Sequence, residues 1–144
     1  MKLFVKAAVL ALLTTIVIAS CAKKTTVIPY IAFRDDSTVF VTNGVTNLNS
    51  ITVTQDSQVF FGVKAFKGGP DDVLTRFYIN VAYDDSSSYH QLFTEDLVNY
   101  KDTFKKLYSV YTRKLNGKER YNFVVENKDG QKNSVTLTLD VFQP

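Results

Sequence analysis

Cysteine and histidine are nearly absent from this chain, and their scarcity excludes several kinds of chemistry. Cys21 is the only cysteine, so no disulfide bond can form within the chain and a hydrophobic core alone must hold the fold together. His90 is the only histidine, which excludes a zinc site built from several histidines or cysteines. It follows Ser86–Tyr89, but neighbouring residues of an extended chain point to opposite faces and make a poor nucleophile and base pair. We therefore predict no catalytic residues and no enzyme activity.

A concentration of basic charge is also missing. The chain has 17 Lys and Arg against 14 Asp and Glu, and two of the basic residues, Lys2 and Lys6, precede an apolar segment that we interpret below as a removable signal, which leaves 15. These alternate with acidic residues, whereas a nucleic-acid-binding protein needs a concentrated basic face to displace counterions. We expect no nucleic-acid partner.

The abundant residues favour β-strands. The 11 Phe and 8 Tyr, with many Val and Thr, suit a pleated, half-buried surface better than a helix. A hydrophobic fraction of 45% with 22% charged residues is typical of a globular protein, and 144 residues provide room for one ordinary domain. The composition predicts an all-β fold around a single core.

The first twenty residues have the pattern of an export signal. Two lysines precede the apolar run Ala7–Ile18. This run of about 12 residues is shorter than the roughly 20 that cross a bilayer as a helix, which disfavours a permanent transmembrane anchor. We expect residues 1–20 to form a helical signal segment.

Residues Ile18-Ala19-Ser20-Cys21 resemble the bacterial lipobox, in which small residues fit a peptidase groove and the cysteine thiol receives diacylglycerol. The resemblance implies cleavage between Ser20 and Cys21 and attachment of the remainder to a membrane through lipid on Cys21. Two or three acyl chains, at about 0.8 kcal/mol per buried methylene, make release negligible. The alternative is an ordinary signal peptide followed by a free thiol.

The residues after Cys21 bear on location. Residue 22 is Ala, whereas an Asp there resembles an inner-membrane retention signal, so the outer membrane is favoured. The composition is similar to that of small lipoproteins of the Bacteroidota, but residues 22–24 lack the acidic residues that often mark surface export there, which favours the periplasmic face. Residues 21–26 are expected to form a lipidated tether, in which Ala22–Thr26 spans at most about 17 Å, so that a domain at 27–144 lies close to the bilayer.

Apolar segments separated by turn signals predict about seven strands. Val27–Phe33 is expected at a sheet edge, because Pro29 cannot donate to a strand ladder. Asn43-Gly44 predicts a hairpin within Thr38–Leu48, and Ile51–Thr54 a further short strand. Together these pieces predict an edge that switches between two sheets.

Two further hairpins are predicted along the rest of the chain. The first joins Ser57–Lys67 to Val73–Tyr83 across a Gly- and Asp-rich break, and the second joins Lys118–Asn127 to Asn133–Phe142 across Asp129-Gly130. In the first hairpin the residues expected to face inward are Val59, Phe61, Val63, Ala65, Thr75, Phe77, Ile79, Val81 and Tyr83.

The stretch His90–Tyr111 fits both a strand and a helical stripe of Leu and aromatic residues. We expect an irregular crossing at Thr94–Lys101 and a strand at Thr103–Thr112, because a helix would leave the second sheet one strand short.

The last third of the chain resembles the final hairpin of immunoglobulin-like sandwiches, in which a tyrosine opens the penultimate strand and a core residue follows two positions later. Tyr121 and Phe123 match that spacing. The resemblance implies that the Tyr121 hydroxyl bonds back to the preceding loop. It also implies that Phe61 or Val63 packs in place of the antibody disulfide, and that Phe77 replaces the antibody tryptophan. These departures point to a fibronectin-like, cadherin-like or bacterial immunoglobulin-like antiparallel β-sandwich.

Asp71, Asp72 and Asp129 are candidates for a calcium site. The loops that hold them would meet at one end of a sandwich, where oxygens from neighbouring loops could bind calcium in a cadherin-like manner. Asp is equally a common turn residue, and no EF-hand spacing is present, so no metal or other cofactor is assigned.

Phe60 and Phe66 are expected on the outer face of one strand, and Tyr78 with Val124 on the outer face of the other sheet. Phe60, Phe66 and Tyr78 are candidates for a binding face, since aromatic platforms bind sugar rings or proteins. The alternative is that a crossing segment covers them. We therefore expect a membrane-anchored, non-catalytic envelope lipoprotein that binds a protein or glycan. The alternative function is a structural lipoprotein that assembles with outer-membrane neighbours, which an exposed patch at strand edges would favour.

Overall fold

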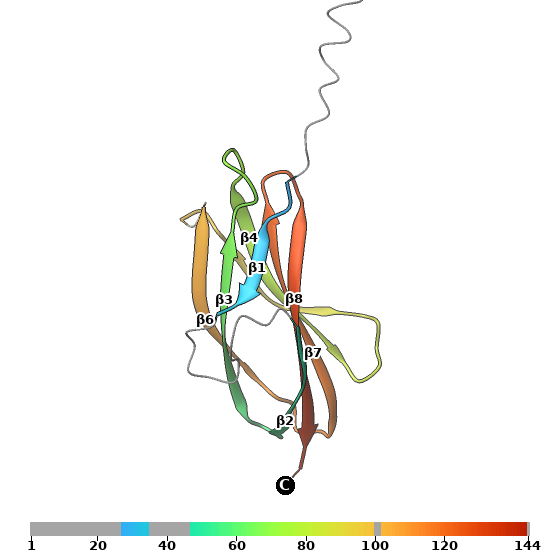
Figure 1. Ribbon diagram of the computed structural model, residues 1–144. Helices are drawn as coiled ribbons and strands as arrows, with labels where there is room; N and C mark the ends of the chain where they lie inside the picture. The colour runs from blue at the N-terminus through green and yellow to red at the C-terminus, as the bar shows by residue number, and fades with distance from the viewer. Residues whose placement is uncertain (1–26, 35–46, 100–101, 144) are drawn as a thin grey trace, which may run out of the picture.

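The computed structural model describes residues 27–34, 47–99 and 102–143, which form eight β-strands (Figure 1). The predicted signal segment, the tether with Cys21 and the Asn43-Gly44 hairpin lie outside the described residues. Nowhere in the described part of the chain is there a helix long and apolar enough to cross a membrane. The strands are β1 (Tyr30–Phe33), β2 (Asn47–Thr54), β3 (Gln58–Phe66), β4 (Leu74–Tyr83), β5 (His90–Asp96), β6 (Thr103–Tyr111), β7 (Gly117–Asn127) and β8 (Lys132–Phe142).

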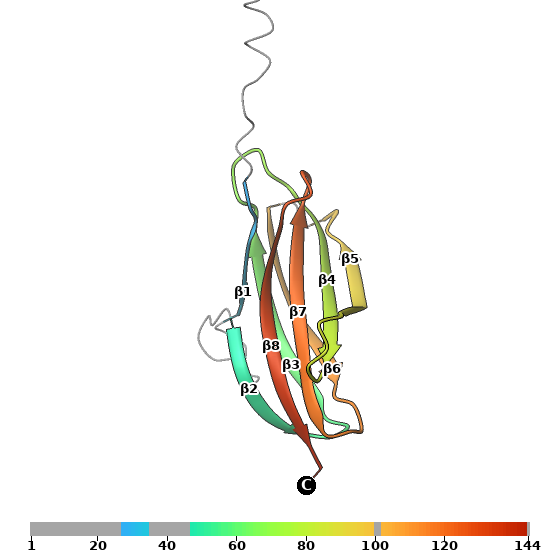
Figure 2. The same cartoon turned by 90° about the vertical axis from the view of Figure 1, so that its right-hand side faces the viewer.

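Two sheets pack face to face, with strand orders β1-β3-β6 and β2-β8-β7-β4-β5 (Figure 2). Paired strands are antiparallel, except that β2 runs parallel to β8. Strands β8, β7 and β4 lie in the order of the GFC strands of an immunoglobulin-like sandwich, and β2 and β5 flank them as the two edges of the larger sheet. The all-β immunoglobulin-like fold is therefore confirmed. The predicted edge that switches sheets is confirmed too, because β1 and β2 join different sheets.

Aromatic rings fill the centre of the core. Phe123 lies between the sheets, with its ring centroid 4.4 Å from that of Phe61 and 5.5 Å from that of Phe33. Phe77 is fully buried and stacks on Tyr108 at 5.0 Å. The inward sets predicted for β3 and β4 are buried or pack against the core, apart from Thr75. Ring packing thus occupies the middle of the sandwich, where antibody domains have a disulfide and a tryptophan.

The exception at Thr75 has a local cause. The register between β4 and β7 shifts between Leu74 and Arg76, so that Leu74 and Phe77 are buried while the two residues between them are exposed. Strict alternation across the start of β4 was therefore the wrong expectation, because a bulge adds one residue to one strand of the pair.

The first predicted hairpin is wrong, although its two strands are placed correctly. β3 and β4 belong to different sheets: β3 pairs with β1 and β6, whereas β4 pairs with β5 and β7. Both strands bury one whole face, which alternation reveals. The alternation of buried and exposed residues does not reveal which neighbouring strands pair with β3 or β4. The side chains alternate in the same way whichever strand forms the backbone hydrogen bonds.

Within His90–Tyr111, the described residues form the strands β5 and β6 and no helix. The predicted strand at Thr103–Thr112 corresponds to β6. The expected crossing begins later than predicted, because Thr94–Asp96 still belong to β5 and pair with β4. β5 is an exposed edge strand, so its sequence lacks the buried alternation that identifies the other strands.

Tyr121 bonds to the preceding loop through a carboxylate. Its hydroxyl donates to Glu119 Oε2 at 2.5 Å, and Glu119 Oε1 accepts the backbone N–H of Arg113 at 2.8 Å. Both Tyr121 and Glu119 are buried, at 1% and 0% exposure. Burial and the Glu119 carboxylate raise the pKa of Tyr121 well above its ordinary value. The implied direct bond from hydroxyl to loop is thus corrected, since Glu119 lies between them.

Candidate binding surface

Three rows of paired residues cross the outer face of the larger sheet. Side chains at alternate positions of β5, β4, β7 and β8 point outward, and the register sets them side by side. We call this surface the Tyr78 face. In order across β5, β4, β7 and β8, its rows are Asp96, Arg76, Glu126 and Lys132; Thr94, Tyr78, Val124 and Ser134; and Gln91, Asn80, Asn122 and Thr136.

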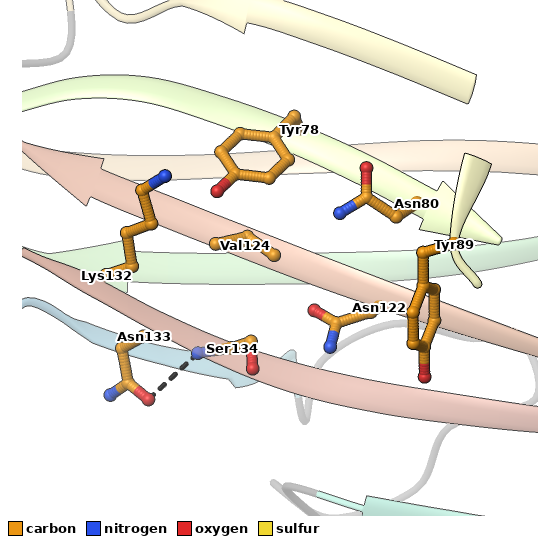
Figure 3. Close-up of a pocket in the computed structure, with 8 residues that line it drawn as sticks. All are labelled: Tyr78, Asn80, Tyr89, Asn122, Val124, Lys132, Asn133 and Ser134. Atoms are coloured by element: carbon orange, nitrogen blue, oxygen red, sulfur yellow. Dashed lines mark hydrogen bonds between the residues drawn. The ribbon is translucent and has the colours of Figure 1, made fainter. Parts of the chain in front are cut away.

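The middle row is built around an aromatic ring. Tyr78 is half-buried, and the Lys132 Nζ lies 5.6 Å from its ring centroid. Hydrogen bonding to Tyr78, supported by the nearby Glu126 carboxylate, raises the pKa of Lys132 above its ordinary value, so the amine is fully charged at neutral pH. Val124 lies beside Tyr78 and is only 7% exposed (Figure 3). The middle row therefore places the Tyr78 ring next to the apolar side chain of Val124.

Three of the four residues in the third row are amides, and the row leads to a second tyrosine, Tyr89. Asn80 and Asn122 are paired across β4 and β7, and their amide groups lie between the rings of Tyr78 and Tyr89 (Figure 3). Asn122 Oδ1 is buried and makes no hydrogen bond with the described residues. The Arg120 guanidinium lies 5.8 Å from the Tyr89 ring centroid and donates to the Ser86 carbonyl. The loop between β4 and β5, which contains Ser86 and Tyr89, is thus held against this end of the sheet.

The first row alternates in charge. Arg76 Nε is 3.4 Å from Asp96 Oδ1, and Lys132 Nζ is 3.6 Å from Glu126 Oε2. All four side chains lie on the outer face, where such pairs are screened by solvent and contribute little to stability. Their main consequence is that this edge of the Tyr78 face carries two charges of each sign.

Two shallow depressions hollow the Tyr78 face and share Tyr78, Asn80 and Lys132. One, of about 280 Å³, extends toward β8 and the Tyr89 ring. The other, of about 510 Å³, extends over β5 to Gln91 and Asp96. Because they share one residue from each of the three rows, they form one open trough that runs across four strands.

The predicted aromatic residues lie on two different faces. Phe60 and Phe66 project from β3 in the smaller sheet, and the Phe66 ring lies 5.8 Å from that of Tyr30. Tyr78 projects from β4 in the other sheet. All three are partly buried. A single surface that uses all three residues is therefore impossible, because the two sheets turn their outer faces in opposite directions.

The three candidate calcium ligands lie at one end of the sandwich, where the β3–β4 loop meets the β7–β8 turn and Lys128 N donates to Val73 O at 2.9 Å. Asp72 is 5% exposed, and its carboxylate accepts the backbone N–H groups of Gly68 and Val73 at 3.0 and 2.8 Å. Burial by itself raises the pKa of Asp72, but these bonds and one from Asn127 outweigh it and lower the pKa.

Asp71 and Asp129 are exposed at this same end. Across the described ranges, no three His, Cys, Asp or Glu side chains are grouped as metal ligands. The geometry thus assigns Asp72 a structural role in holding the loop.

Sequence reasoning identified Tyr78 but missed the polar residues around it. Asn80, Asn122 and Lys132 come from three separate strands, and nothing in their local sequence distinguishes them from ordinary exposed strand residues. The sequence indicated only that each of these side chains points outward, from its place in the alternation along its strand. The strand order is needed to show that the three lie on one surface.

Comparisons with known proteins place the chain in no family. No family model matches it, and no curated protein does. Among solved structures it is similar to the superoxide reductase neelaredoxin from Ignicoccus hospitalis, with 8% identity, 80% of each chain covered and a TM-score of 0.46. It is also similar to murine CRIg, with 9% identity, 81% of this chain and 98% of that chain covered, and a TM-score of 0.40. Identities and TM-scores this low carry no information about ligand or activity.

Proposed function

We propose that this chain is a non-catalytic binding module of the bacterial cell envelope, anchored through lipid on Cys21, and that the Tyr78 face is its binding surface. The lipobox-like residues support the anchor. The observation that supports binding is the trough itself, in which an aromatic ring and several amides are gathered on the open face of a rigid sheet. Ligand sites commonly combine an apolar contact surface with a few placed polar groups.

Lipid attachment is tested by fractionating cells that express the full chain or its Cys21→Ala form. The unchanged chain is expected in the membrane fraction with the added mass of the lipid, and the variant in the soluble fraction. Equal distribution of the two forms, without added mass, would contradict the anchor.

The binding surface is tested with the full lipidated protein in nanodiscs, incubated with an envelope extract divided into protein and polysaccharide fractions. Tyr78→Ala should reduce whatever is retained by about tenfold, because truncating a central aromatic contact removes a large share of binding energy. The matched control is Tyr111→Ala, which changes a tyrosine that is 67% exposed on the other sheet. Retention that is unchanged by Tyr78→Ala would refute this assignment.

One observation favours the alternative, a structural lipoprotein that assembles with membrane neighbours. Leu107 and Tyr111 are 54% and 67% exposed on β6, an edge strand of the smaller sheet. Exposed edges with apolar residues tend to pair with other chains. The alternative is tested by crosslinking in intact cell envelopes, which should capture one stoichiometric partner protein. The double variant Leu107→Ala with Tyr111→Ala should abolish the crosslinked product, whereas Tyr78→Ala should not. That combination of results would replace the first proposal with the assembly function.

A further inference from the structure

We infer that the ligand of the Tyr78 face is an uncharged oligosaccharide of two or more sugar units, lying along the trough across β5, β4, β7 and β8. This inference rests on the proposed function, and it names the chemical class of the ligand. Three features of the surface support it: its charge balance, the kind of polar groups it presents and its length.

The charge balance disfavours an anionic or cationic ligand. The charged residues that line the two depressions are Arg76, Lys132, Asp96 and Glu126, so their charges cancel. They are also paired with one another, which leaves no unbalanced charge for a phosphate, sulfate or carboxylate. Arg120, near the Tyr89 ring, already donates to a backbone carbonyl. A ligand on this surface gains more from hydrogen bonds and ring contact than from ion pairing.

The polar groups match sugar hydroxyls. Asn80 and Gln91 each present a donor and an acceptor in one plane, and Thr94 and Ser134 add hydroxyl groups. A hydroxyl both donates and accepts, so amides satisfy it without a charge. The Tyr78 ring, beside Val124, supplies a flat apolar surface of the kind on which the C–H face of a sugar ring can rest.

The length of the trough indicates more than one sugar unit. The smaller depression, of about 280 Å³, is at the lower end of the roughly 300–1,000 Å³ typical of small-molecule sites. The larger one, of about 510 Å³, continues from the same Tyr78 and Asn80 toward the β5 edge. A single sugar would occupy only part of this surface, whereas a short linear oligosaccharide would contact both depressions at once. The trough is open, so we expect weak binding that increases with chain length.

The test uses the full lipidated protein in nanodiscs and a panel of neutral oligosaccharides of one to six units, with sulfated and uronic-acid oligosaccharides as charged probes. We expect at least one neutral series to bind from two units upward. Tyr78→Ala should weaken that binding by about tenfold, and Tyr111→Ala should leave it unchanged. Tyr78→Phe keeps the ring and should bind within about threefold of the unchanged protein. Raising the salt concentration should change the affinity less than twofold, because no charges are paired on binding.

Other outcomes overturn the inference in distinguishable ways. Binding confined to the charged probes, and weakened by salt, would refute a neutral ligand while leaving the Tyr78 face as a binding surface. If no oligosaccharide binds but Tyr78→Ala still abolishes retention of an envelope protein, the glycan inference fails and the proposed function survives. If binding responds to Tyr111→Ala and not to Tyr78→Ala, both fail.

Discussion

Replacing Tyr121 with Phe tests how the loop before β7 is fixed to the core. The substitution removes one oxygen atom and keeps the buried ring. That oxygen donates to Glu119, whose other carboxylate oxygen accepts the Arg113 backbone N–H. The variant therefore leaves a fully buried carboxylate oxygen without its donor, in a site from which water is excluded.

The expected cost follows from the charge of the acceptor. A hydrogen bond to a charged group contributes about 1.5–3 kcal/mol. Glu119 Oε1 keeps the Arg113 side chain at 3.6 Å, but Oε2 loses its donor while it stays buried, which places the effect toward the upper part of that range. We expect Tyr121→Phe to lower the free energy of unfolding by about 2–3 kcal/mol. For a domain of this size that is a large fraction of the roughly 5–15 kcal/mol that stabilises most native proteins.

The assay is urea unfolding at pH 7 of the chain lacking residues 1–20, with Cys21→Ala in every variant so that lipid plays no part. Tyr111→Phe is the matched control, because its hydroxyl is removed from a residue that is 67% exposed and should change stability by less than about 0.5 kcal/mol. The midpoint should shift without a change in the denaturant slope, since the surface exposed on unfolding is nearly the same.

The dependence on pH provides a second check. The folded-state pKa of Tyr121 lies above its ordinary value of 10.0, so its contribution is complete below pH 10 and is lost as the pH rises further. The difference in stability between the unchanged chain and Tyr121→Phe should therefore be constant at neutral pH and shrink above pH 10. A loss below about 0.5 kcal/mol at pH 7, or a difference that does not depend on alkaline pH, would refute the bond to Glu119.

Two other perturbations test the core and the end of the sandwich. Phe123→Ala removes the ring that lies 4.4 Å from Phe61 at the centre of the core, and it should cost about 3–5 kcal/mol of unfolding free energy in the same urea assay; a cost below about 2 kcal/mol would show that the ring is not enclosed there. Asp72→Asn should destabilise the chain at neutral pH, because the carboxylate accepts two backbone N–H groups of the β3–β4 loop. The lowered folded-state pKa means that this contribution is present above pH 3.8 and is lost as the pH falls below it, so the difference from the unchanged chain should shrink in acid. Acid titration of both proteins measures this, with Asp71→Asn, which changes an exposed carboxylate of the same loop, as control. A difference that stays constant down to pH about 2 would contradict the expectation.

The sequence by itself determined the class of fold and most of the strands. Alternation at Val59, Phe61, Val63 and Ala65 identified a buried face, because side chains of a strand point to opposite sides in turn. The Asp129-Gly130 turn located the final hairpin, and Gly130 indeed has a positive φ of 75°. Strand alternation and turns are set by residues that are adjacent in the chain, so they can be predicted from the sequence alone.

Only the tertiary structure decided which strands pair and, through that, where the candidate site lies. β3 and β4 follow one another in the sequence and yet belong to different sheets. The alternation along a strand does not specify its partner, because a strand buried on one face can form backbone hydrogen bonds with any strand that buries its side chains on the same face of the sheet. The rows that place Asn80 beside Asn122, and Arg76 beside Asp96, exist only in the register of four strands. An outward-facing polar residue on a strand has little effect on the stability of the fold, wherever it lies. The local sequence pattern therefore does not distinguish the polar residues of a binding surface from other exposed strand residues.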